Sequence, residues 1–265
     1  MQNISLLLGS SQNLHLTKLV NSKKVLFVEG EDVKILAKIS KTTGHENLFS
    51  SDLTVIPIKG FSNHEKIIHA NWAFSKVLGH ELKFIVLLDR DYRSNIVIDK
   101  IVENFKNQNI DIHILKRKEI ENYLLSLNAL NSAIEERIKS RQTSGSTPDI
   151  ANFDFNKLIF EITDEFKSYT YGQLSRDLYS QKSKEDQSVL ISKHHEDFEQ
   201  NWKNIDYRLS TVCGKDLIAK INEKIQDKLG ISITTTLIVN KMKKNEVDSD
   251  LIDFFVKLEN FMLNN

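Results

Sequence analysis

The chain has 265 residues, 40% of them hydrophobic, which is enough for a sizeable core in one large domain or two modest ones. Its 36 basic and 36 acidic side chains balance, so nucleic-acid binding must depend on a local patch and not on a global field. The single cysteine, Cys213, excludes an internal disulfide, and no apolar run reaches the roughly 18 residues of a membrane helix. We therefore expect a cytoplasmic protein that does not enter a membrane.

Strand-like and helix-like segments alternate in the first half of the chain. Such alternation is typical of βαβ units and predicts an α/β fold, with a parallel sheet flanked by helices. The third strand is apolar throughout, as expected for a strand buried on both faces. The predicted strands cover 24–32, 53–63, 83–91 and 110–118, and the predicted helices cover 31–41, 64–79 and 95–108.

The pattern changes after residue 127. Residues 128–150 are predicted as a helix followed by a polar linker, because 141–149 combine polar residues with Gly and Pro. Residues 151–265 are predicted as a mainly helical C-terminal subdomain. One β-branched run in it, 230–239, fits either a strand or a helix.

Acidic residues follow three of the predicted strands. Glu29 ends the first, Asp89 and Asp91 end the third, and Glu119 and Glu121 lie just beyond the fourth. Ligands of an open parallel sheet bind beyond the carboxyl ends of its strands, so these carboxylates are expected at one rim. Unpaired, they would raise one another's pKa values, and a hard cation such as Mg²⁺ removes that cost. Two such ions about 4 Å apart can clamp the attacking and leaving oxygens of a phosphoryl transfer.

Each of these motifs also has an ordinary interpretation. An Asp-x-Asp pair at a strand end is often a helix cap or a surface pair, and Val-Glu-Gly-Glu-Asp is often a plain strand-to-helix turn. On a continuing strand, however, Asp89 and Asp91 would point to the same face, which suits joint metal binding. The order and spacing of the motifs together carry the metal-site hypothesis.

Three segments, LFVEGEDVKIL, FIVLLDRDYR and KRKEIENYLL, resemble the Toprim domain of nucleases of the OLD (overcoming lysogenization defect) family. The resemblance runs from about residue 23 to 125 and predicts a Toprim domain over 23–127. It implies that Glu29 is a metal ligand and general acid or base, and that Asp89 and Asp91 are metal ligands. It also implies a metal ligand in EIENYL, with Glu121 favoured over Glu119.

Two further site positions follow from the same resemblance. OLD nucleases carry an acidic residue shortly after the first glutamate; Asp32 or Glu31 would serve, although the residue four positions after Glu29 is Val33. A lysine from the C-terminal region completes the family's site, and VCGKDLIAKIN makes Lys215 the candidate, which would offset charge on the scissile phosphate. The alternative for Lys215 is a solvated lysine in the first turn of a helix.

Basic side chains gather in two places. Lys116, Arg117 and Lys118 lie beside the predicted rim, and the segment 213–244 carries seven basic and three acidic residues, among them Lys215 and Lys220. These lysines and the arginine are predicted to contact DNA, since phosphate contacts supply most of the non-specific affinity. The alternative for the second group is a solvated helix face with i,i+4 ion pairs, such as Asp216 with Lys220.

The N-terminal stretch LGSSQNLHLTKLVNSKKVLFVEGE resembles the junction that leaves the ABC-type ATPase domain of OLD proteins, so residues 1–22 are predicted as a tail from such a domain. No G-x-x-x-x-G-K-[ST] phosphate loop occurs, and no nucleotide site is expected in this chain. The ATPase would then be a missing domain or a separate subunit. The resemblance also implies assembly into an oligomer.

The sequence thus predicts an enzyme: an endonuclease, a phosphodiester hydrolase that uses Mg²⁺ or Mn²⁺, with two ions expected, to nick or cleave DNA. By resemblance it would be the nuclease module of an ATPase-coupled antiviral (anti-phage) defence system. One alternative is a catalytically silent Toprim scaffold or regulatory module bound to an ATPase. The other is a phosphatase of the haloacid-dehalogenase type, which LLDRDYR fits less well because it lacks a small hydroxyl residue after the pair and lies on the third strand.

Overall fold

The chain folds into two compact units. The computed structural model describes residues 23–30, 33–50, 52–58, 67, 82–145, 150, 153–180 and 187–263. The first unit contains the described residues up to Asp89, Ile98–Leu115 and the residues from Asp248 onward, and the second contains Arg90–Val97 and Lys116–Val247. The predicted helix over 64–79, apart from Ile67, and the candidate ligand Asp32 lie outside the described residues.

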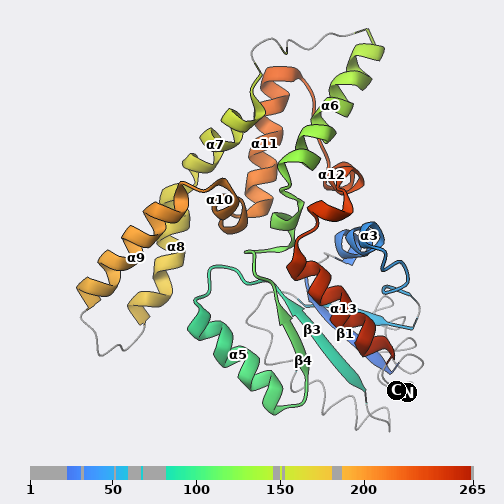
Figure 1. Ribbon diagram of the computed structural model, residues 1–265, viewed down its shortest axis with the longest axis vertical. Coiled ribbons are helices and arrows are strands. Elements are labelled where there is room, and N and C mark those ends of the chain that lie inside the picture. The colour runs from blue at the N-terminus through green and yellow to red at the C-terminus, as the bar shows by residue number, and fades with distance from the viewer. Residues whose placement is uncertain are drawn as a thin grey trace, which may run out of the picture. The chain divides into compact units, whose positions relative to one another are not determined.

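The first unit is built on a four-stranded parallel sheet with the order β2-β1-β3-β4 (Figure 1). The α/β class and the parallel sheet predicted from the sequence are confirmed. Both central strands are buried along their length, and the proline of β2, Pro57, lies on an edge strand where a missing N–H is tolerated. The strands are β1 (Lys24–Glu29), β2 (Thr54–Ile58), β3 (Lys83–Leu88) and β4 (Asp111–Ile114).

The strand order defines a switch point between β1 and β3. Helix α3 (Val33–Thr43) connects β1 to β2 in one direction, and α5 (Asn95–Asn107) connects β3 to β4 in the other. Right-handed crossovers that leave in opposite directions place their helices on opposite faces of a sheet. The crevice that opens where the direction reverses, beyond the carboxyl ends of the strands, is where α/β sheets bind ligands.

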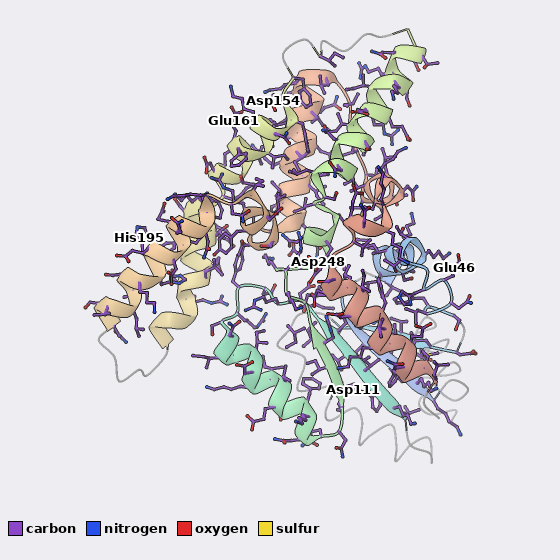
Figure 2. All side chains as sticks on the ribbon, in the orientation of Figure 1. Glu46, Asp111, Asp154, Glu161, His195 and Asp248 are labelled. Atoms are coloured by element: carbon purple, nitrogen blue, oxygen red, sulfur yellow. The ribbon has the colours of Figure 1, made fainter. Side chains whose placement is uncertain are left out.

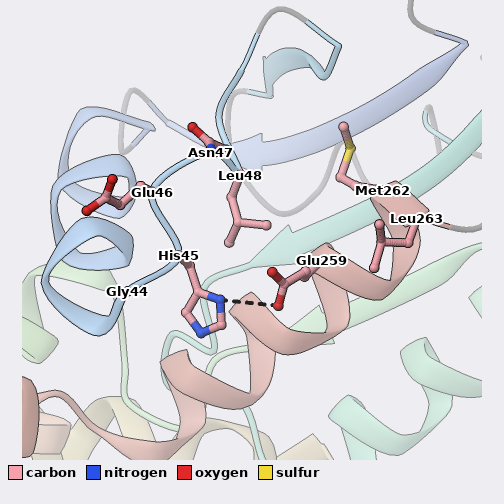
Figure 3. Close-up of a pocket in the computed structure, with 8 residues that line it drawn as sticks. All are labelled: Gly44, His45, Glu46, Asn47, Leu48, Glu259, Met262 and Leu263. Carbon is pink, nitrogen blue, oxygen red and sulfur yellow. Dashed lines mark ion pairs between the residues drawn. The ribbon is translucent and has the colours of Figure 1, made fainter.

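The last helix, α13 (Ser249–Leu263), belongs to the sheet unit. Lys257 Nζ donates a hydrogen bond of 2.8 Å to the carbonyl oxygen of Ile112 in β4. His45 Nδ1 lies 3.4 Å from Glu259 Oε2, which ties α13 to the segment after α3 (Figure 3). The predicted division placed all of 151–265 in the helical subdomain. The structure divides differently because α13 carries an apolar face, and Phe254 of that face packs on His113 of β4 at 5.3 Å between ring centroids.

The second unit is mainly helical, as predicted, and its described residues contain no strand. Helix α6 packs on α12, α7 on α11 and α8 on α9 (Figure 1). The unit also takes in the end of the predicted Toprim segment, and α6 runs into the predicted linker. Its elements are η2 (Ile120–Leu124), α6 (Leu127–Thr143), α7 (Phe155–Glu165), α8 (Lys167–Ser180), α9 (Gln187–Trp202), α10 (Ile205–Thr211), α11 (Gly214–Leu229), α12 (Thr235–Lys241) and η3 (Lys244–Glu246). None of the described helices is long and apolar enough to cross a membrane.

Capping groups set the helix boundaries in this unit. Asp154 Oδ1 accepts a hydrogen bond of 3.0 Å from the Lys157 amide at the start of α7 (Figure 2). The Thr234 hydroxyl accepts from the Leu237 amide at 3.2 Å and starts α12, so the β-branched run 230–239 ends in a helix. Gly230 ends α11 in the left-handed conformation, with φ of 65°.

Replacing Gly230 with Ala tests this helix end. An alanine there must adopt the left-handed conformation, and its Cβ would lie 2.7 Å from Nη1 of Arg141. We expect Gly230→Ala to lower the free energy of unfolding by about 1–2 kcal/mol, measured by chemical denaturation. Gly172→Ala is the matched control, because a Cβ in α8 meets nothing within 4 Å and should stabilise the helix by about 0.5–1 kcal/mol. Equal effects of the two substitutions would contradict this account.

Candidate functional site

Two predicted site residues lie at the carboxyl edge of the sheet unit. Glu29 is the last residue of β1, and Asp89 follows β3 directly and is 8% exposed. Because Val28 of β1 lies opposite Leu87 of β3, the two carboxylates leave neighbouring strands at the switch point. Gly30 turns the backbone sharply after Glu29, with a φ of 71° that glycine adopts without strain.

Asp91 has a different setting from Asp89. The expectation of a continuing strand is wrong, because β3 ends at Leu88 and Asp91 is left-handed, with φ of 51°. Its carboxylate forms an ion pair with Arg93 at 2.5 Å and lies 3.9 Å from Lys118 Nζ. Asp91 therefore belongs to the second unit, and two protein cations meet its charge.

Glu119 is buried and its carboxylate is occupied by protein donors. It accepts hydrogen bonds from Lys118 Nζ at 2.5 Å, the Lys215 amide at 2.8 Å and Cys213 Sγ at 3.3 Å. Burial alone would raise the pKa of Glu119, but these hydrogen bonds and the Lys118 charge hold it below its usual value. Burial raises the pKa of the Cys213 thiol to about 12, so the thiol stays protonated and donates. Glu119 thus acts as the internal anion of this unit.

Glu121 is as deeply buried but keeps one oxygen without a hydrogen bond. Its Oε1 lies 3.5 Å from Lys215 Nζ, and its Oε2 is buried without a hydrogen-bond partner among the described residues. Burial raises the pKa of Glu121, and the Lys215 charge opposes that rise. Of the two glutamates in EIENYL, Glu121 has the chemistry of a ligand or proton carrier, and the structure pairs it with the predicted lysine.

Two residues that the sequence analysis missed hold this arrangement. The Asn122 side chain has 0% exposure; its amide donates to the carbonyl oxygens of Leu209 at 2.7 Å and Val212 at 2.8 Å. Gly214 starts α11 so close to η2 that an added Cβ would lie 2.8 Å from the Asn122 backbone nitrogen. An isolated Gly before a predicted helix and an Asn inside EIENYL were the available signals.

The predicted DNA-binding cluster 116–118 has two kinds of member. The side chains of Lys116 and Lys118 line a cavity of about 440 Å³. Arg117 instead stacks its guanidinium over the Tyr123 ring, 5.5 Å from the centroid, and donates to the Asn122 carbonyl oxygen at 3.1 Å. Burial lowers the pKa of Lys118, but the Glu119 hydrogen bond and charge outweigh it and raise the pKa, so Lys118 is cationic.

Ion pairs offset much of the positive charge of the segment 213–244. Lys220 pairs with Glu223 at 2.8 Å and with Glu165 of α7 at 3.5 Å, not with Asp216 as the i,i+4 alternative had it. Lys241 pairs with a glutamate of α6. Lys220 was predicted to contact DNA, and the structure already pairs it with two carboxylates.

Each unit offers carboxylate oxygens of the kind that hard divalent ions prefer: Glu29 and Asp89 in the first unit and Glu121 in the second. Glu121 Oε2 is the clearest case, because it is buried and accepts no hydrogen bond from a described residue. The described part of the chain has no group of three or more His, Cys, Asp or Glu side chains placed to hold a metal. Comparison with protein-family models, curated proteins and solved structures found no match to this chain.

Removing the Glu119 carboxylate should destabilise the second unit. Glu119→Ala leaves Lys118 buried without its anion, and we expect a loss of about 3–5 kcal/mol in the free energy of unfolding. Because the folded pKa of Glu119 is lowered, its stabilisation is present above the unfolded pKa of about 4.3 and is lost as the pH falls further. The difference between wild type and variant, measured by urea denaturation, should thus narrow in acid.

The control for this substitution is Lys157→Ala, which breaks the exposed pair with Glu161 on α7 (Figure 2). It should cost under about 1 kcal/mol at every pH. A Glu119→Ala variant as stable as Lys157→Ala at neutral pH would show that the buried pair of Lys118 and Glu119 stabilises the unit no more than an exposed ion pair does.

Gly214→Ala tests the close approach of α11 to η2. The new Cβ would meet backbone atoms of Glu121 and Asn122, at 3.0 and 2.8 Å, which cannot move independently of η2. We expect a loss of about 1–3 kcal/mol in the free energy of unfolding, measured by chemical denaturation. Gly172→Ala again serves as the control. If Gly214→Ala left the free energy of unfolding unchanged, α11 would not pack closely against η2.

Proposed function

We propose that the chain is a divalent-metal-dependent endonuclease that nicks or cleaves DNA, built on a Toprim-like domain of the OLD type. The observation that carries the proposal is the position of Glu29 and Asp89 at the ends of the two strands that flank the switch point. A parallel sheet delivers ligand-binding groups at that place. Two neighbouring carboxylates there favour a cation and a phosphate-bearing substrate.

The residue roles follow the chemistry of each side chain. Glu29 and Asp89 would hold Mg²⁺ or Mn²⁺, with Glu29 also able to carry a proton, and Asp91 and Asp32 are further ligands by resemblance. Glu121 would contribute its unpaired oxygen. When bound, the metal would supply electrostatic stabilisation of the charge that develops on the phosphate.

Lys215 would supply positive charge from the protein. Its side chain is 56% exposed, and its Nζ is held 3.5 Å from Glu121 Oε1. An ammonium that is both anchored and accessible can approach a phosphate oxygen as negative charge builds up there. Burial raises the pKa of Glu121, which makes its carboxyl group a candidate for carrying a proton beside Lys215.

The wider setting of the proposal rests on the resemblance alone. We propose an ABC-type ATPase, fused or separate, as the partner that controls cutting, an oligomeric assembly, a cytoplasmic location, and a role in anti-phage defence. Control by an ATPase predicts that the chain alone cuts weakly or without regulation.

The test is cleavage of supercoiled plasmid by the purified chain with Mg²⁺, Mn²⁺, Ca²⁺ or EDTA. Glu29→Gln and Asp89→Asn keep the side-chain shapes, and each is expected to reduce Mn²⁺-dependent nicking by at least about a hundredfold. Asp111→Asn is the matched control, a 61% exposed carboxylate on β4 that pairs with Lys257 (Figure 2). It should nick as the wild type does. Circular dichroism confirms that each variant is folded.

Two other results would point elsewhere. Nicking that survives both Glu29→Gln and Asp89→Asn would place the activity at another site or in a contaminant. No nicking with any metal, also after an ATPase partner is supplied, would favour the scaffold, which the pairing of Asp91 with Arg93 and Lys118 supports. Hydrolysis of p-nitrophenyl phosphate without nicking would favour the phosphatase.

A further inference from the structure

The second unit contains a cavity of about 440 Å³, and the described residues that line it all belong to this unit. Three parts of the unit surround it: the segment 90–95, the residues 116–118 that precede η2, and helices α8 to α10. Its volume falls within the ~300–1,000 Å³ range of small-molecule sites. Its lining includes Arg90, Arg93, Lys116, Lys118, His194 and Tyr207.

Cationic side chains outnumber carboxylates in the lining of this cavity. Among the described residues, four cationic side chains line it and Asp91 is the one carboxylate of the lining. Asp91 pairs with Arg93 and approaches Lys118, and Glu119 pairs with Lys118, so carboxylates offset two of the four cations. Hydroxyl and amide side chains make up much of the remaining wall and add neutral hydrogen-bonding groups. Such a lining selects a compact anion with several acceptor oxygens, which is the description of a phosphate group.

Backbone hydrogen bonds fix the walls relative to one another. The Asp91 amide donates to the Lys118 carbonyl oxygen at 2.8 Å, and the Lys118 amide donates to the Ser210 carbonyl oxygen at 2.9 Å. Lys118 itself is 8% exposed and is held by Glu119. Lys118 is therefore held in place before a ligand arrives, which reduces the cost of ordering its side chain on binding.

Another part of the lining of the same cavity is aromatic. Tyr92, His194 and Tyr207 line it together with Leu174. The His194 ring stacks on Tyr171 at 5.5 Å between centroids, and its Nε2 is buried without a hydrogen-bond partner among the described residues. A buried ring nitrogen without a partner is costly, and a hydrogen-bonding group on a ligand would relieve that cost. A phosphate alone would leave this aromatic part of the lining unused.

We propose that this cavity binds one unpaired nucleotide, its phosphate on the cationic side chains and its base among the aromatic ones. The inference deepens the proposed function, on which it rests, by naming the substrate as a strand with a single-stranded or unpaired nucleotide. The sequence predicted no nucleotide site because no phosphate loop occurs. This cavity is of another kind, since scattered side chains and not a glycine-rich backbone turn build it.

The test is a binding measurement in EDTA, which removes cleavage from the readout. Fluorescence anisotropy of a labelled oligothymidylate is followed while thymidine monophosphate, thymidine or inorganic phosphate competes. Thymidine monophosphate should compete at least about fivefold more tightly than either fragment. The single strand should also bind more tightly than a duplex of the same length.

Two variants connect the binding to the cavity. Lys116→Gln removes an exposed lining cation and should weaken binding of thymidine monophosphate about tenfold. His194→Phe keeps a ring against Tyr171 but removes the buried nitrogen, and it should also weaken binding. Lys139→Gln is the matched control, an exposed lysine of α6 outside the cavity, and should bind as the wild type does. Thermal denaturation confirms that all three variants are folded.

Several outcomes would overturn the inference. Equal competition by inorganic phosphate would mean an anion site only, and equal competition by thymidine would mean a site for the base only. Binding of thymidine monophosphate without binding of the strand would mean a pocket for a free nucleotide. Preference for the duplex, or full binding by Lys116→Gln, would place strand binding elsewhere.

The same experiment separates this inference from the proposed function. Plasmid nicking without nucleotide binding would refute the inference and leave the nuclease standing. Nucleotide binding without nicking under any metal would refute the nuclease and leave the nucleotide-binding cavity standing.

Discussion

A buried ion pair between Lys118 and Glu119 connects several segments of the second unit that are far apart in the sequence. Glu119 receives hydrogen bonds from Cys213 and the Lys215 amide, and Lys118 is bonded through its backbone to Asp91 and Ser210. A buried pair of this kind is costly to desolvate and more costly to leave half-complete, so it fixes one arrangement of the segments around it. The pairing of Lys215 with Glu121 and the walls of the cationic cavity both depend on that arrangement.

The sequence was sufficient for the sheet and insufficient for the division of the chain. Apolar β-rich runs predicted the four strands of the described residues, and the signal was clearest for β1 and β3, because a strand buried on both faces leaves a continuous apolar signature. The run 230–239 was ambiguous because its β-branched residues favour a strand. Its second half forms a helix, which the hydroxyl group of Thr234 caps. The place of α13 was not predictable, since its partners His45, Ile112 and His113 are distant in the chain.

The candidate site was predictable to the extent that it lies at strand ends. The positions of Glu29 and Asp89 follow from the strand pattern, whereas the ion pair of Glu121 with Lys215 joins two residues that only the resemblance had singled out. The prediction for Asp91 was wrong because it assumed that side chains continue to alternate between the two faces of a strand. The strand ends at Leu88, and Asp91 itself has a left-handed backbone conformation. Asn122 and Gly214 were missed because their roles arise from contacts between segments far apart in the chain, which periodicity does not report.

The return of α13 to the sheet makes the first unit discontinuous, with Lys116–Val247 inserted between β4 and the last helix. A ribosome therefore releases the whole helical insertion before it releases the helix that covers β4. Until then the aromatic partners of His113 and His45 are missing, and part of the sheet unit stays exposed. We expect the inserted unit to fold first during synthesis and the sheet unit to close last, so that the carboxylate edge matures only after α13 has been made.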